Sequence, residues 1–220
     1  MKYLALYFSA PTMSWGTSSK FDTKSTDEYP SKSAIIGMIC TALGKSGEQI
    51  EFLKLLNEEI NFNVYCFSDI HYMNDFQTIG CGYDSNAYWE RRMIPHRMNN
   101  KDFKPQLINK EYLVGQKYGI IISSENEDLI NEIGNGFKHP IWPIFFGRKC
   151  NIPDSRIFKG YYSSENDALN IFKEKYNLEP KFLITEQAIN NANYFYKNDV
   201  PVQFGKNKIY KRRLIYKKYF

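Results

Sequence analysis

Three short segments combine glycine or serine with cations or an aromatic ring, which is the chemistry needed to hold a phosphate backbone. Trp15-Gly16 follows an alternating apolar segment, Lys32-Ser33 stands where an apolar helical pattern begins, and Gly147-Arg148-Lys149 follows a further apolar run. Flexible turns and a helix N-terminus present backbone N–H groups to an anion, and lysine or arginine adds a full charge. A tryptophan ring can stack on a base. These segments indicate nucleic-acid binding. The alternative is that Trp15 is a core residue and Lys32 an ordinary solvated lysine.

The elements expected around these segments are read from the spacing of apolar residues. They are a strand over 2–9, a helix over about 33–43 with Ser31 or Ser33 as N-cap and Gly44 as stop, an amphipathic helix over 50–60, strands over 62–67 and 118–123, a helix that starts after 124–125 and ends near 134–136, and a short strand or extended segment over 141–146. The order strand–helix–strand–strand–helix–strand predicts an α+β fold of the ferredoxin-like, RRM type.

Residues 69–109 form a long insertion between the second and third predicted strands. Its length predicts an architecture of its own or a partner, because structureless loops of this length are uncommon in compact domains. Trp89, Arg91, Arg92 and Arg97 give it an aromatic and basic character with few aliphatic side chains. We therefore expect a ferredoxin-like RNA-binding domain over 1–150, with a thumb-like insertion, and a smaller C-terminal lobe over 151–220. The alternative for the insertion is a loop that stays disordered until assembly.

Bulk composition excludes several classes of protein. With 220 residues, of which 43% are hydrophobic, the chain can bury a substantial core. It has no apolar run long enough to span a membrane and no signal-like start, which favours a cytoplasmic protein. Its four cysteines are widely spaced and its three histidines are not clustered with them, so we expect no metal site and no cofactor. Gly44-Lys45-Ser46 is not a nucleotide-binding loop, because Ile39 stands where the motif requires glycine.

Positive charge is concentrated in the last fifteen residues. The net charge is +5; residues 206–220 contribute +7 without any acid, and the remaining residues therefore −2. Three tyrosines, Tyr210, Tyr216 and Tyr219, alternate with these cations. This mixture suits a polyanion such as RNA, because cations neutralise phosphates and aromatic rings stack on bases. The alternative is a solvated, lysine-rich strand.

Five segments in register along nearly the whole chain carry a resemblance to a known family. They are 9–16 with 30–44 (SAPTMSWG and PSKSAIIGMICTALG), 75–80 (DFQTIG), 110–113 (KEYL), 143–150 (PIFFGRKC) and 199–204 (DVPVQF). In this order they resemble the CasD family of the RAMP superfamily, the type I-E CRISPR Cascade subunits that cap the 5′ handle of the guide RNA (crRNA). The resemblance implies antiviral defence, a CasC-type backbone subunit and a CasA-type large subunit as partners, and contact with target DNA only through the complex.

The resemblance also implies individual site residues. Lys24 and Lys110 stand where relatives commonly carry arginine. A lysine can neutralise a phosphate, but it lacks the planar guanidinium that donates two parallel hydrogen bonds to the edge of a base. Phe145 stands where many relatives carry tyrosine, so a stacking surface is kept and a hydroxyl is lost. The RNA-binding set expected from residues and resemblance together is Trp15, Gly16, Lys24, Lys32, Ser33, Lys110, Phe145, Arg148 and Lys149. Within the thumb insertion, Trp89, Arg91, Arg92 and Arg97 are the expected partner contacts.

Some relatives in other CRISPR subtypes cut precursor RNA themselves with a metal-independent Tyr/Lys/His set. Here Lys110 and Tyr112 are separated by Glu111, and neither His96 nor His139 has an obvious partner in the sequence. Cleavage needs both a general base and a general acid. We therefore expect a non-catalytic RNA-binding subunit, with a metal-independent endoribonuclease as the alternative.

Overall fold

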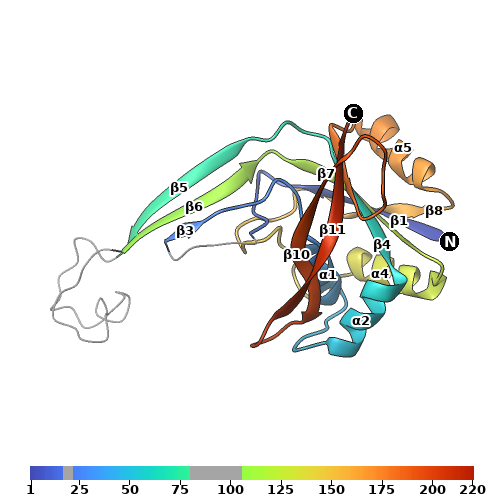
Figure 1. Ribbon diagram of the computed structural model, residues 1–220, viewed down its shortest axis with the longest axis horizontal. Coiled ribbons are helices and arrows are strands. Elements are labelled where there is room, and N and C mark those ends of the chain that lie inside the picture. The colour runs from blue at the N-terminus through green and yellow to red at the C-terminus, as the bar shows by residue number, and fades with distance from the viewer. Residues whose placement is uncertain (17–21, 80–105) are drawn as a thin grey trace.

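The computed structural model describes residues 1–16, 22–79 and 106–220. Along the chain the elements are β1 (Lys2–Ser9), β2 (Thr12–Met13), β3 (Thr23–Lys24), α1 (Lys32–Ala42), α2 (Ile50–Glu59), β4 (Asn61–Cys66), β5 (Tyr72–Ile79), β6 (Gln106–Val114), β7 (Lys117–Ser124), α4 (Glu127–Lys138), β8 (Phe158–Tyr162), α5 (Glu165–Tyr176), β9 (Phe182–Thr185), β10 (Asn193–Gln203) and β11 (Ile209–Tyr219). The fold is a mixed α+β arrangement of two sheets, as Figure 1 shows.

The larger sheet has seven strands in the order β10-β11-β9-β4-β7-β1-β8, and every neighbouring pair in it is antiparallel. Alternation along β1 assigns its side chains to two sides of the sheet. Leu4, Leu6 and Phe8 belong to a core shared with α1, α2 and α4, whereas Ala5 and Tyr7 pack in a second core with α5. Helices therefore cover both faces of the sheet, and the side chains of β1 and β7 are mostly buried between them.

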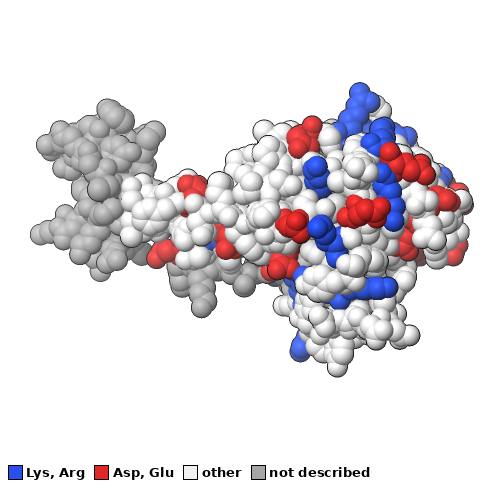
Figure 2. Space-filling model, turned by 90° about the horizontal axis from the view of Figure 1, so that it is seen from above, with Lys and Arg blue, Asp and Glu red and all other residues white. Residues whose placement is uncertain are grey.

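The smaller sheet is an arm that projects from this body (Figure 1). In it β6 pairs antiparallel with β2 and β5, and parallel with β3. The predicted insertion thus has its own architecture at both of its described ends. Trp89, Arg91, Arg92 and Arg97 lie outside the described residues. On the face seen in Figure 2, the arm is mostly uncharged and the cations and acids intermingle over the body.

Glycines explain one difference between the predicted and the observed elements. The helix expected to end near 134–136 continues as α4 to Lys138. A Cβ at Gly134 would overlap with the ring of Tyr161, and one at Gly136 would press on Leu43. These glycines therefore allow close packing on neighbouring elements and do not end the helix.

The extended segment expected over 141–146 is not a strand, and β8 takes the place beside β1. Residues 141–146 instead form an irregular segment in which Ile144 and Phe146 are buried.

The predicted domain boundary at residue 150 stays a prediction. Strands from both sides of it share the larger sheet.

Candidate nucleic-acid interface

Two adjoining hollows beside the N-terminal half of α1 bring together segments that are far apart in the sequence. The larger has a volume of about 500 Å³ and the smaller about 300 Å³. They share Trp15, Ser33, Ala34, Gly37 and Gly147 in their walls. The loop after β2, the start of α1 and the loop after α4 therefore meet in one groove.

Ser14 joins the two loops of this groove. Its backbone N–H donates to the carbonyl of Phe146 at 3.0 Å, and its hydroxyl oxygen accepts from Arg148 N at 3.2 Å. The same hydroxyl oxygen accepts from the amide of Asn151 at 3.0 Å. Gly147 sits against the Ser14 carbonyl with a φ of +93°. The groove is therefore a fixed structure, with its glycine backbone held close to the loop that carries Gly16.

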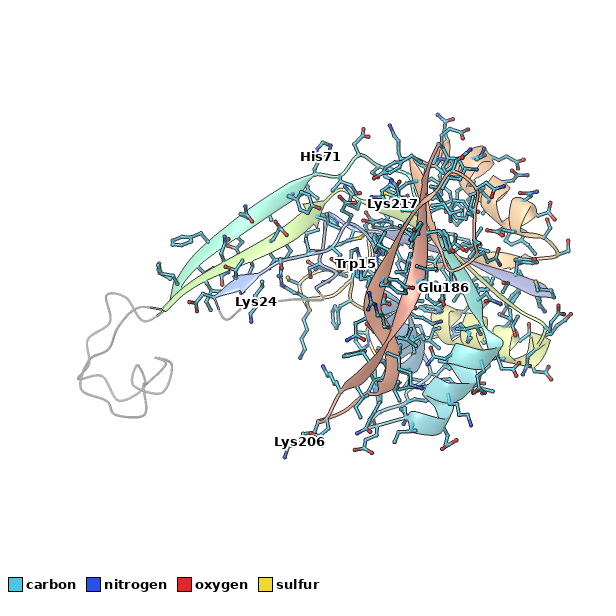
Figure 3. The ribbon with its side chains drawn as sticks, viewed as in Figure 1. Trp15, Lys24, His71, Glu186, Lys206 and Lys217 are labelled. Carbon is cyan, nitrogen blue, oxygen red and sulfur yellow. The ribbon has the colours of Figure 1, made fainter. Side chains whose placement is uncertain are left out.

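Trp15 lies in the core, and its predicted stacking role is corrected. The residue is 1% exposed and its ring packs on Phe8, Phe146 and Tyr118. Figure 3 shows it inside the body, between the arm and the large sheet. Its ring faces are covered by other aromatic side chains, so a base has no access to them in this structure. The alternative interpretation, a core residue, describes it.

Lys32 is also buried, and its predicted contact with phosphate is corrected. Its side chain is 5% exposed and its ammonium is 2.8 Å from a carboxylate oxygen of Glu186. Its backbone N–H, at the start of α1, donates to Asp199 at 2.8 Å. The helix N-terminus is thus already neutralised by an internal carboxylate, which occupies the position expected for a ligand anion.

Asp199 and Glu186 complete a buried ionic cluster with Arg213. The Arg213 guanidinium donates to both oxygens of Asp199, at 2.6 and 2.8 Å, and to Glu186 at 2.8 Å. Burial would raise the pKa of the Asp199 carboxyl, but the hydrogen bonds and charge of Arg213 outweigh it and hold that pKa below its usual range. The cluster fixes the hairpin β10–β11 to α1.

Ser33, Gly16 and Phe145 remain available in the groove. Ser33 is half-buried and shares a hydrogen bond of 3.0 Å with Ser31, the N-cap of α1. Gly16 is exposed, and Phe145 is a half-buried wall of the smaller hollow. These three predicted residues can present a hydroxyl, an exposed backbone and an aromatic surface to one ligand.

Arg148 and Lys149 differ in their environments. The Arg148 guanidinium donates to the backbone carbonyls of Glu111 and Lys24, at 2.7 and 2.8 Å, and covers the ring of Tyr112. It therefore joins the loop after α4 to the arm. Lys149 is exposed and makes no ion pair with any described residue. Of the two predicted cations, Lys149 is the one free to contact phosphate.

Lys24 and Lys110 lie side by side on the arm. Their Cα atoms are partners in the parallel pairing of β3 with β6. Lys110 donates to the side-chain oxygen of Gln77 at 2.8 Å, and both lysines are half-buried. Figure 3 shows Lys24 on the arm, away from Trp15. These two lysines therefore form a separate basic position outside the groove.

The C-terminal hairpin contributes groove residues that were not in the predicted set. Phe204, Lys208 and Tyr210, at the end of the hairpin β10–β11, line the larger hollow opposite α1. The available signal was the mixture of lysine and tyrosine after residue 206, which indicated a polyanion but not the location of the segment. Lys208 supplies the groove with the positive charge that Lys32 does not.

The Tyr112 hydroxyl lies 3.7 Å from the sulfur of Cys150. Burial and the hydrogen bond with Cys150 raise the pKa of Tyr112. His139 lines a different hollow, of about 460 Å³, at the end of α4.

Within the described parts of the chain, no three His, Cys, Asp or Glu side chains gather in a way that would hold a metal ion. The helices described are too short or too polar to cross a membrane.

Comparison with known proteins adds to this geometry. The sequence model of a family described as "CRISPR-associated protein (Cas_Cas5)" matches residues 3–202. No curated protein matches the sequence. A solved chain titled "CRISPR RNA-guided surveillance complex" has 22% sequence identity and a TM-score of 0.75, over 99% of this chain and 89% of that one. A chain titled "Crystal structure of Cas protein" has 17% identity and a TM-score of 0.65, over 99% and 94%. At these identities the likeness establishes a shared fold.

Proposed function

The chain belongs to the CRISPR-associated Cas5 family, and from this premise we propose that it is a non-catalytic subunit of a type I surveillance complex that binds the 5′ handle of the guide RNA. The observation that supports the proposal most is the groove beside α1. There Gly16 and Gly147 expose backbone, Ser33 offers a hydroxyl, and Lys208 with Tyr210 closes the far wall. Backbone amides, one cation and one ring suit a short stretch of unpaired RNA.

The order of strands supports the finer assignment of the fold. Within the larger sheet, β4, β7, β1 and β8 are consecutive neighbours and antiparallel. The crossover from β1 to β4 carries α1, and the one from β7 to β8 carries α4. We therefore propose that these six elements form a ferredoxin-like unit, which the strands β9 to β11 extend at one edge.

Exposed apolar side chains on the arm favour a protein partner there. Tyr72, Met73, Phe76 and Leu107 are 42–64% exposed on β5 and β6. Tyr72, Phe76 and Leu107 share one side of the paired strands and Met73 lies on the other. Exposed apolar side chains gathered on one side of a sheet favour an interaction site. We propose that the arm contacts a CasC-type backbone subunit, that a CasA-type large subunit is a further partner, and that target DNA is reached only through the complex.

Handle binding predicts a steep dependence on salt. With about three phosphate contacts to single-stranded RNA, affinity should fall about 20-fold between roughly 50 and 200 mM salt. The measurement is fluorescence anisotropy with a labelled RNA that carries the 5′ end of a mature guide. Lys208→Ala should weaken binding about 5–10-fold at low salt, because one phosphate contact is lost.

Lys206→Ala is the matched control. Lys206 is an exposed lysine in the same turn, at the tip of the hairpin in Figure 3, but it does not line the hollow. We expect its replacement to change affinity by less than about 2-fold. Equal losses from both substitutions would indicate general attraction by the hairpin and argue against a groove site.

An endoribonuclease that matures precursor RNA is the alternative function. Lys110 and Tyr112 are two residues apart on β6 and so project from the same face of the strand, which is the one observation in its favour. Incubation of the purified chain with repeat RNA in EDTA tests it directly. We expect intact RNA; cleavage at one defined position, abolished by Lys110→Ala, would contradict the non-catalytic proposal.

A further inference from the structure

The hairpin β10–β11 has two faces with different charge arrangements. Within each strand, alternate side chains project to opposite sides, and residues directly opposite one another in an antiparallel pair share a side. On the inner side, each of three cations is paired with an acid: Lys197 with Asp27, Arg213 with Asp199 and Lys217 with Glu28, at 2.5–3.0 Å. These side chains hold the hairpin to the body.

The other side carries rings and unpaired cations. It is made by Tyr194 and Tyr196 of β10 with Arg212, Tyr216 and Lys218 of β11. Tyr194 is 70% and Tyr196 is 58% exposed. Neither Arg212 nor Lys218 forms an ion pair with a described residue, and the sole acid within the two strands is the buried Asp199. We name this side the outer face of the hairpin.

Contacts on the outer face arrange the rings for stacking. The Arg212 guanidinium carbon lies 4.0 Å from the centre of the Tyr196 ring. The rings of Tyr194 and Tyr216, which oppose each other across the strands, have centres 6.3 Å apart. A guanidinium held on a tyrosine and a second ring pair beside it present flat, polarisable surfaces together with positive charge. Unpaired bases stack on such surfaces with little regard to sequence.

The outer face continues directly from the groove. Tyr210, which lines the larger hollow, is an even-numbered residue of β11 and so shares the side of Arg212 and Tyr216. From Tyr210 to Tyr216 the strand advances about 20 Å. Figure 1 shows the hairpin running across the front of the body. An RNA strand that leaves the hollow beside Tyr210 therefore meets the outer face next.

We propose that the outer face of β10–β11 is a second RNA-binding surface, which stacks the unpaired bases adjoining those held in the groove. The proposal rests on the function proposed above and extends it: the groove grips a short defined end, and the outer face adds sequence-independent contact with neighbouring nucleotides. The occupant is single-stranded RNA, because cations without an ion pair alternate with exposed rings along the strand and β10 and β11 themselves carry no exposed acid.

The test compares three RNAs: the handle alone, the handle extended by a few uridines at its 5′ end, and the handle extended in the same way at its 3′ end. The native chain should bind one of the two extended RNAs about 10-fold more tightly than the handle alone, because the added bases stack on the outer face. The double variant Tyr194→Ala, Tyr196→Ala should lose this difference and keep the affinity for the handle alone. Tyr194→Phe, Tyr196→Phe keeps both rings and should retain the difference.

Tyr219→Ala is the matched control, because Tyr219 is exposed on β11 but belongs to the opposite side of the strand. It should leave both affinities unchanged. If the native chain binds all the RNAs equally, or if the alanine pair keeps the preference for the extended RNA, the outer face is not an RNA surface while handle binding stands. If the native chain binds none of the RNAs, both proposals fail together.

Discussion

Asp199→Asn is expected to destabilise the protein by about 3–5 kcal/mol, because it leaves Arg213 buried without its main counter-charge. Asp199 is 1% exposed and accepts hydrogen bonds from the guanidinium of Arg213 and from the first N–H of α1. The asparagine has nearly the same shape, so the loss is electrostatic and not a matter of volume. Urea unfolding followed by circular dichroism measures it as a change in the midpoint at a constant slope.

Glu186→Gln is the matched control for that substitution. It makes the same chemical change in the same cluster, but the Glu186 side chain is 35% exposed and the glutamine oxygen can still accept hydrogen bonds from Lys32 and Arg213. Because the buried Lys32 loses its counter-charge, we expect a loss of about 1–2 kcal/mol, smaller than that of Asp199→Asn. Equal losses for the two variants would show that burial of Asp199 is not what makes the cluster strong.

The pKa of Asp199 gives the same cluster a dependence on pH. Because the folded state holds this pKa below that of the unfolded chain, the stabilisation is fully present above the unfolded value of about 3.9. It is lost as the pH falls through the lower, folded pKa. The stability difference between native chain and Asp199→Asn should therefore be constant near neutrality and shrink below about pH 4.

Gly147→Ala should cost about 2–4 kcal/mol and weaken binding of handle RNA as well. The residue has a φ of +93°, where a side chain is strained, and a Cβ would overlap with the Ser14 carbonyl. The two loops must then separate, which breaks the hydrogen bond from Ser14 N to Phe146 and widens the groove. Thermal unfolding measures the first effect, and anisotropy with handle RNA measures the second.

Gly115→Ala separates backbone strain from steric overlap. Gly115 also has a positive φ, of +63°, but nothing lies within 4 Å of where its Cβ would be. We expect a loss of about 1–2 kcal/mol from strain alone and unchanged RNA affinity. If Gly147→Ala behaves like Gly115→Ala in both measurements, the contact between the two groove loops does not control the site.

Local patterns in the sequence were sufficient for elements whose signals are local. The alternation in β1 and the Ser31 cap with a Gly44 stop on α1 are set by neighbouring residues, and the structure confirms both. The helix end predicted near 134–136 was wrong, and the segment over 141–146 is irregular, with Ile144 and Phe146 buried and Ile141 and Trp142 exposed. In both cases the deciding contact, such as Gly134 against Tyr161, comes from another part of the chain.

The candidate site also shows that local sequence patterns do not predict contacts between distant parts of the chain. Gly16, Ser33 and Phe145 were predicted and line the groove. Lys32 was predicted as a phosphate contact but is paired internally with Glu186, which lies 154 residues further along the chain. The sequence around a lysine at a helix start does not tell whether its partner is a ligand or an acid from a distant part of the chain. Lys208 was not predicted as a groove residue, because its position there depends on where the hairpin β10–β11 packs.

The strand pairing of the large sheet also determines when the molecule can assemble. Within the larger sheet β1 pairs with β7 and β8, and β11 separates β9 from β10. During synthesis the strand Lys2–Ser9 therefore gains its first sheet partner only after more than a hundred further residues, while the hairpin β10–β11 can close locally. Contacts between such distant segments slow folding. Until β7 has been synthesised, β1 lacks both of its sheet partners, and unpaired apolar strands of this kind are prone to aggregation.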